Sequence, residues 1–170
     1  MQKLKTTVSR KTHTGVSDFD INLPLTGTPG IECRTGPTPG EHKVVISFPA
    51  SVTFTSAAVT TGVGVASATG SGTSTVTVNL SGVSNAQTII ITLFNVSDGT
   101  NSSSVGIPMS LLAGDVNFTS SVSGSDVNLC KAQVGLPVSA SNFQNDINTT
   151  GSISGSDVNL TKAQVGTNLP

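Results

Sequence analysis

The sequence predicts a mainly β chain that ends in a small helical region, and two observations carry this prediction. Between residues 16 and 112, short segments rich in Val and Ile are separated by clusters of Gly, Pro, Ser and Asn, as is typical of strands and turns. After residue 112 a segment is duplicated, so that Asp115 and Asp126 return as Asp146 and Asp157, 31 residues later. We therefore expect a basic arm at 1–15, a β domain at 16–112 and a duplicated helical domain at 113–170.

The first 15 residues form the polar, basic arm. Lys3, Lys5, Arg10 and Lys11 are half of the eight basic residues of the chain. The segment Thr-Thr-Val-Ser within the arm is compatible with a strand, and two arrangements are open. The arm could pair with the sheet edge of a neighbouring copy, which is a head-to-tail contact that builds a filament. Alternatively, it could fold back as the first strand of its own sheet.

The β domain is expected to hold about seven short strands, which favours an immunoglobulin-like β-sandwich. The segment at 73–80 alternates polar and apolar residues, as a strand with one buried face does. The segment at 88–96 is more continuously apolar and should lie centrally in its sheet. The expected strands are 17–23, 42–48, 51–59, 63–68, 73–80, 87–96 and 105–111.

Each copy of the duplication reads as an oxygen-rich loop that leads into a short helix. Counted from its first Asp, each loop places carboxylate, amide or hydroxyl groups at the positions from which a calcium loop draws its ligands. Ca²⁺ prefers oxygen, and the absence of thiolate and imidazole groups from the loops disfavours zinc and copper. The candidate ligands are Asp115, Asn117, Thr119, Ser121, Ser123 and Asp126 in loop one, and Asp146, Asn148, Thr150, Ser152, Ser154 and Asp157 in loop two.

The match to a calcium loop is partial. The fifth position is Thr in both copies, and the sixth, which needs a sharp turn, is Gly151 in loop two but Ser120 in loop one. With two carboxylates per loop, we expect a Kd on the order of 10⁻⁴–10⁻³ M, with loop two the tighter site. The eighth residues, Val122 and Ile153, should point inward and pair the loops. The alternative is a pair of polar turns without a metal.

A capped helix is predicted after each loop. Ser123 and Ser154 stand at the N-cap, each with an Asp three residues later. Gly135 and Gly166 stand where each helix should end. The buried helix face is expected to hold Val127, Cys130 and Val134 in the first copy, and Val158, Thr161 and Val165 in the second.

The paired Gly-Asp-Val-Asn…Ser-Asp-Val-Asn-Leu…Lys segments resemble a dockerin domain over residues 113–170. The resemblance implies a duplicated calcium fold with near two-fold symmetry that binds a cohesin partner, in two alternative orientations because both copies read Gly-Ser. The segment that begins at Phe19 resembles sandwich domains found beside dockerin repeats in secreted bacterial proteins. The residues that would contact the partner are Gly124, Ser125 and Lys131, with Gly155, Ser156 and Lys162.

Composition argues against several other functions. The chain has no Trp or Tyr, so it lacks the stacking platforms typical of nucleic-acid and sugar sites. No run of 18 apolar residues is present, so no membrane insertion is expected. The only histidines are His13 and His42, and the carboxylates Glu32 and Glu41 have no aromatic subsite beside them. We therefore expect no enzyme activity.

Together these features predict a non-catalytic, calcium-binding protein that is extracellular or on the cell surface and acts through protein–protein association. Its partner would be either further copies of itself, in a fibre or sheath, or a cohesin-like domain. The alternative is a calcium-assisted carbohydrate-binding module. Cys33 and Cys130 could be bridged or be two buried thiols. Surface glycans could be carried by the sequons at Asn79, Asn95, Asn101, Asn117, Asn148 and Asn159, although a calcium ligand cannot also be glycosylated.

Overall fold

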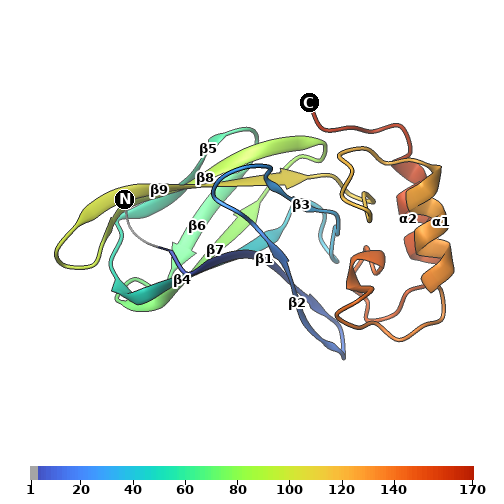
Figure 1. Cartoon of the computed structure of the whole chain (residues 1–170), viewed down its shortest axis with the longest axis horizontal. Helices are drawn as coiled ribbons and strands as arrows, with labels where there is room; N and C mark the ends of the chain where they lie inside the picture. The colour runs from blue at the N-terminus through green and yellow to red at the C-terminus, as the bar shows by residue number, and fades with distance from the viewer. Residues whose placement is uncertain (1–3) are drawn as a thin grey trace.

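A computed structural model describes residues 4–170 and shows a mainly β chain, in which the described part forms two sheets and two α-helices (Figure 1). The first three residues of the expected arm, Lys3 among them, lie outside the described residues. The strands are β1 (Thr6–His13), β2 (Ser17–Asn22), β3 (Gly30–Glu32), β4 (His42–Val52), β5 (Ser56–Thr61), β6 (Val65–Thr69), β7 (Thr73–Ser81), β8 (Gln87–Ser97) and β9 (Ser102–Leu111). The helices are α1 (Gly124–Gln133), the short 3₁₀ helix η1 (Phe143–Asn145) and α2 (Gly155–Ala163).

The two sheets enclose one apolar core. The first has the strand order β2–β1–β4–β7–β6 and the second the order β3–β9–β8–β5. Neighbouring strands are antiparallel except β3 and β9, which are parallel. The core is built mainly from the inward side chains of the interior strands. It includes Val44, Ile46, Val76 and Val78 from the first sheet, and Ile89, Ile91, Leu93, Ile107 and Met109 from the second.

Each of the seven expected strand segments overlaps a strand of the structure. The prediction that 88–96 lies centrally is confirmed, because β8 is paired with β9 on one side and β5 on the other. The boundary between the second and third expected strands is shifted, since β4 continues to Val52 and β5 begins only at Ser56. β1 and β3 were not among the expected segments.

β1 corrects the expectation of a separate arm. It is hydrogen-bonded on both sides, so that Val8 faces Asn22 of β2 and Val45 of β4. Of the two arrangements left open by the sequence, the structure therefore has the strand folded back into its own sheet. The expected boundary between residues 15 and 16 falls in the turn between β1 and β2.

The two helices begin as predicted but end earlier. Ser123 and Ser154 form complete capping boxes with Asp126 and Asp157. Val134 and Val165, expected on the buried face, are 44% and 50% exposed. The reason is that α1 ends at Gln133 and α2 at Ala163, so both valines lie beyond the last helical turn. The rest of the predicted face is buried, namely Val127, Cys130, Val158 and Thr161.

The eighth loop residues are buried, but they do not pair the loops as expected. Val122 packs with Ile31 and Leu112 at the end of the sheets, whereas Ile153 packs in a separate cluster with the helices. The amide of Val122 donates to Thr167, and the amide of Gly135 donates to Ile153. Each loop is thus tied to the segment that follows the other helix, and these bonds replace a direct pairing of the loops.

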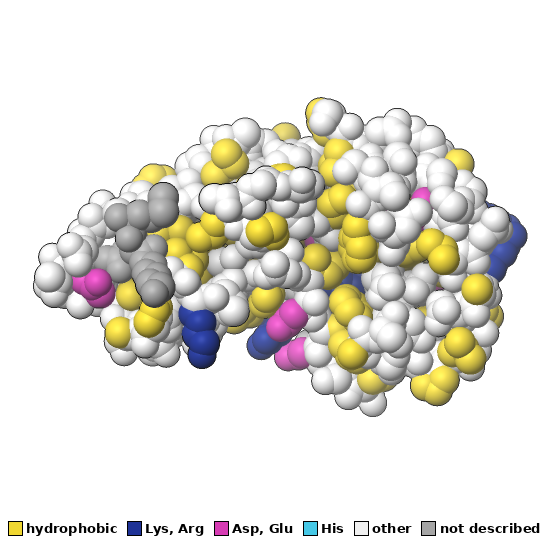
Figure 2. Space-filling model, viewed as in Figure 1, with side chains coloured by type: hydrophobic (Ala, Val, Ile, Leu, Met, Phe, Trp, Pro, Cys, Tyr) yellow, Lys and Arg dark blue, Asp and Glu magenta, His cyan; other side chains and the backbone are white. Residues whose placement is uncertain are grey.

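The surface is sparsely charged. On the face shown in Figure 2, charged side chains appear as isolated spots on a mostly uncharged surface, in keeping with a charged fraction of 10%. Within residues 4–170, no helix combines the length and the apolar character needed to cross a bilayer.

Candidate functional site

The first carboxylate of each loop is fully buried and held by backbone amides. Asp115 accepts hydrogen bonds from the amides of Thr119 at 3.0 Å and Ser120 at 2.8 Å. In loop two, Asp146 accepts from the amides of Thr150 at 3.0 Å and Gly151 at 2.8 Å. The duplication of the sequence is therefore also a duplication of loop geometry.

The last carboxylate of each loop closes the loop and caps the following helix. Asp126 accepts from the Ser123 amide at 2.9 Å and from the Asn117 amide at 3.4 Å. Asp157 accepts from the corresponding amides, those of Ser154 at 2.9 Å and Asn148 at 3.4 Å. Both carboxylates are fully buried, so each loop holds its two negative charges away from solvent.

The other candidate ligands divide into two groups. In loop one, the Thr119 hydroxyl lies 2.7 Å from Asn117 Oδ1 and 3.3 Å from the Ser121 carbonyl oxygen, so positions three, five and seven come together. In loop two, the Thr150 hydroxyl lies 3.3 Å from the Ser152 carbonyl oxygen. The ninth residues, Ser123 and Ser154, instead use their hydroxyls as N-caps of α1 and α2.

This arrangement fits a hard divalent cation such as Ca²⁺. Burial, together with the nearby Asp126 carboxylate, raises the pKa of Asp115 above its ordinary value, and a cation between the two carboxylates would oppose that rise. Among residues 4–170, no three His, Cys, Asp or Glu side chains meet at one point. Each loop offers two carboxylates with amide, hydroxyl and carbonyl oxygens, so the chemistry suits Ca²⁺ and not Zn²⁺.

The two loops differ at the sixth residue. Ser120 and Gly151 both adopt the left-handed conformation, with φ of 68° and 84°. Glycine adopts it without strain, whereas a residue with a Cβ does not. Gly151 also lies against the turn after β1, because a Cβ there would stand 2.0 Å from the carbonyl oxygen of Thr14. At this position loop two is thus the less strained loop, and it packs closely on the turn after β1.

A buried polar relay connects loop two to the sheets, and sequence reasoning missed it. His13 of β1 lies 2.7 Å from Asp146 through Nδ1, and both side chains are fully buried. Arg34 Nη1 lies 3.2 Å from His13 Nε2. Because a guanidinium only donates, Nε2 is the acceptor, and this places the imidazole proton on Nδ1, which donates to Asp146. No local sequence pattern pairs these two residues, since 133 positions separate His13 from Asp146.

Arg34 and Glu32 complete the relay. Two parallel hydrogen bonds of 2.8 Å join the guanidinium to the carboxylate, and Ser9 donates to the same carboxylate. Burial raises the pKa of Glu32, but the charge and hydrogen bonds of Arg34 outweigh this and hold it at about 2. The guanidinium also lies 5.0 Å from the centre of the Phe143 ring, so the relay reaches η1 in the repeat region (residues 113–170).

Backbone hydrogen bonds reinforce this connection. The amides of Thr35 and Gly36 donate to the Ile147 carbonyl, at 2.8 and 3.1 Å. The Thr14 amide donates to the Thr149 carbonyl at 3.1 Å. Loop two therefore rests on the turn after β1 and on the segment after β3.

The other polar residues considered from the sequence do not form a common site. Glu32 is buried and hydrogen-bonded in the relay, while Glu41 is exposed. Cys33 and Cys130 are free, buried thiols that face the neighbouring carbonyls of Gln144 and Asn145. Burial raises the pKa of both thiols, that of Cys130 to about 11.

No family model matches the chain, and no curated protein or solved structure is significantly similar to it. The two loops, the relay and the exposed helix faces are therefore the features on which a functional proposal rests.

Proposed function

We propose that residues 113–170 are a dockerin-like pair of calcium-binding units joined to an immunoglobulin-like β-sandwich, and that the chain is a non-catalytic, extracellular anchoring protein. The supporting observation is the repeated loop geometry. Four buried carboxylates, two in each loop, accept backbone amides at the same distances in both copies. Such oxygen-only loops with few charges are typical of weak extracellular calcium sites.

The exposed faces of the two helices favour a protein partner. Leu129 of α1 and Leu160 of α2 are 46% and 37% exposed, although each lies within a helix. Lys131 and Lys162 lie two residues beyond them and are also exposed. Apolar side chains beside a single cation, repeated with the period of the duplication, would give a cohesin-like partner two equivalent surfaces to bind.

Anchoring is favoured over self-assembly by the position of β1. This strand is paired on both edges, so it offers no strand to a neighbouring copy. Light scattering over a range of concentrations, with calcium and with chelator, separates the two roles. A monomer in both conditions is expected, whereas growth in mass with concentration would favour the fibre or sheath.

Calcium binding is tested by thermal unfolding in 5 mM calcium and in excess chelator. With a Kd on the order of 10⁻⁴–10⁻³ M, each occupied site adds about 1–2 kcal/mol to the free energy of unfolding. The midpoint should therefore rise by several degrees in calcium.

Asp157→Asn should remove most of this rise, because it deletes one of the two charges of loop two while keeping the size of the side chain. Asp98→Asn is the matched control, since Asp98 is an exposed residue outside both loops. An unchanged midpoint in calcium, or an equal effect of both substitutions, would contradict the calcium proposal.

A further inference from the structure

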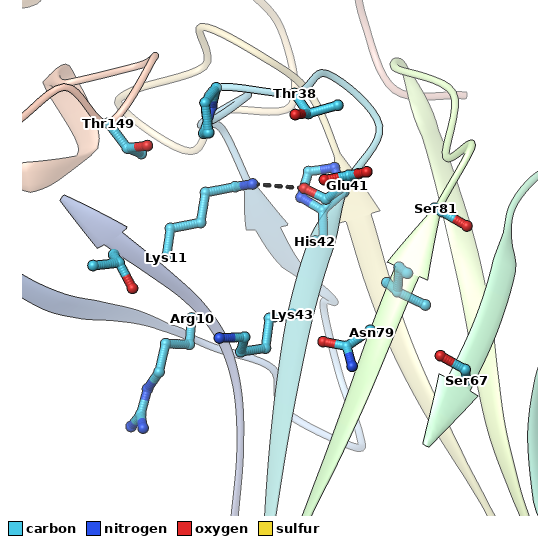
Figure 3. Close-up of a pocket in the computed structure, with 13 residues that line it drawn as sticks. Arg10, Lys11, Thr38, Glu41, His42, Lys43, Ser67, Asn79, Ser81 and Thr149 are labelled. Atoms are coloured by element: carbon cyan, nitrogen blue, oxygen red, sulfur yellow. Dashed lines mark hydrogen bonds between the residues drawn. The ribbon is translucent and has the colours of Figure 1, made fainter. Parts of the chain in front are cut away.

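A cavity of about 550 Å³ lies on the outer side of the five-stranded sheet. Its floor comes from β1, β4, β7 and β6, and the segment before β4 and Thr149 form a wall above it (Figure 3). This volume is within the range of ligand-binding sites. Thr149 is the only lining residue from the repeat region, and none of the candidate calcium ligands lines the cavity.

A row of polar side chains crosses the floor of the cavity. Arg10 is the register partner of Lys43, Lys43 of Asn79, and Asn79 of Ser67. Directly paired residues point to the same face of a sheet, and neighbouring strands lie about 4.8 Å apart. The row, visible from Arg10 to Ser67 in Figure 3, therefore presents one polar group per strand across four strands.

Most of these groups have no partner within the protein. Within residues 4–170, the side chains of Lys43, Asn79 and Ser67 form no hydrogen bond or ion pair, and Nδ1 of His42 is buried without a partner. Arg10 is the exception, since two hydrogen bonds of 2.8 and 2.7 Å join it to Asp20.

Among the Lys and Arg residues that line the cavity, Lys43 is the one whose side chain has no hydrogen-bond or ion-pair partner in the part of the chain that the structure describes. The Lys11 amine, a second cation in the lining, donates to the carbonyls of Thr35 and Glu41. Asp20 is paired with Arg10, and Asp18 accepts from Thr12. Of the lining residues, only Glu41 carries a negative charge, and it lies in the segment before β4.

We propose that this cavity binds an acidic polysaccharide whose chain lies across the strands, with Lys43 pairing with a sugar carboxylate and Asn79 and Ser67 binding sugar hydroxyls. The strand spacing is close to the length of one sugar residue in an extended chain, so successive residues meet successive side chains. No aromatic ring lines the cavity, so recognition depends on hydrogen bonds and charge, not on stacking. This differs from the calcium-assisted sugar site considered from the sequence, because no calcium loop supplies a ligand here.

The test is affinity electrophoresis of the full chain in native gels that contain either polygalacturonate, an acidic polymer, or dextran, a neutral one. Retardation is expected only in polygalacturonate. Lys43→Gln and Asn79→Ala should each weaken the affinity about tenfold, as expected for the loss of one hydrogen bond to a charged or polar group. Both side chains are exposed, and circular dichroism checks that each variant is folded.

Lys5→Gln is the matched control, since it removes the same charge from an exposed residue before β1, outside the cavity and the helix faces, and should leave the retardation unchanged. Three results with these polymers and variants would each overturn the proposal, and a fourth comes from a polymer that is not a sugar. These are no retardation in polygalacturonate, equal retardation in dextran, and an equal loss for Lys43→Gln and Lys5→Gln, which would indicate a general charge effect. Retardation by polyglutamate that depends equally on Lys43 and Asn79 would also overturn it, because the site would then not select a sugar.

Discussion

The sixth residue of each loop shows how one side chain sets the strain of a loop. Ser120 and Gly151 share the left-handed conformation, but only Gly151 adopts it without a steric penalty. The Ser120 side chain forms no hydrogen bond in the part of the chain that the structure describes, and the hydrogen bond from its amide to Asp115 is matched by that from the Gly151 amide to Asp146, so loop one has no additional bond that compensates the strain. The difference accounts for an asymmetry between two loops that are otherwise alike.

Exchanging these residues should have opposite effects. Ser120→Gly should raise the free energy of unfolding by about 1 kcal/mol, because it relieves the left-handed strain. Gly151→Ser should lower it by about 2 kcal/mol or more, since the new Cβ would also clash with the Thr14 carbonyl. Urea unfolding in chelator measures both without a contribution from metal. A stabilised Gly151→Ser variant would show that loop two does not pack on the turn after β1 as described.

At the scale of elements, the strands that could be predicted are those with an apolar inner face. β7 alternates Val76, Val78 and Leu80 with polar residues, and β8 is apolar over most of its length. The capping boxes of α1 and α2 could also be predicted from the sequence, because Ser and Asp lie three residues apart in one segment.

β1 could not be predicted in this way because its inner face is polar. Thr7, Ser9, Lys11 and His13 are all buried, although none is apolar. Their burial is explained by partners such as Glu32 and Asp146, which come from other parts of the chain and which no local pattern reveals. β3 has only three residues, which are too few to show the alternation of polar and apolar residues that marks a strand.

The same reasoning explains which part of the candidate site was predictable. The ligand positions follow from spacing within one loop, so they could be proposed from the sequence. The relay from Glu32 through Arg34 and His13 to Asp146 depends on contacts between separate elements. It required the three-dimensional arrangement.

The relay itself can be tested at His13. His13→Phe keeps an aromatic ring beside Phe19 and Phe143 but leaves Asp146 and Arg34 each without one hydrogen-bond partner. It should lower the free energy of unfolding by about 2–3 kcal/mol, because both groups are buried. Thr12→Val, on the outer face of the same strand, is the control and should cost less than about 1 kcal/mol. Equal losses in the two variants would show that the relay adds nothing to stability.

At the scale of the whole molecule, the segment 32–36 links the β strands to the repeat region. The segment 32–36 supplies Glu32 and Arg34 to the relay and donates two amides to Ile147. The carbonyls of Glu32 and Cys33 also accept the amides of Leu112 and Gly114, at the start of the repeat region. Loop two is therefore bonded to the β strands, so calcium bound there would stabilise the contact between the β strands and the repeat region as well as the loop.

Acid should destabilise the whole chain in two steps. Burial, assisted by the nearby charge of Lys11, lowers the pKa of His42 from 6.5 to about 4. The unfolded chain therefore binds this proton more readily than the folded chain, and stability falls as the pH drops from about 6.5 to 4. Glu32 acts in a lower window, because its pKa falls from 4.5 to about 2, so the stability it contributes is lost between about pH 4.5 and 2.

The upper step can be isolated with a single substitution. Urea unfolding in chelator should show a lower free energy of unfolding at pH 4.5 than at pH 7 for the natural chain. His42→Gln should reduce that difference. Glutamine does not titrate, so the unfolded variant no longer gains a proton at this position between pH 7 and 4.5. Glu32→Gln is the comparison, since it leaves the step above pH 4.5 in place and changes the loss below it. If stability were constant from pH 7 to 4.5, or if His42→Gln and the natural chain lost it equally, the buried neutral state of His42 would not be the cause.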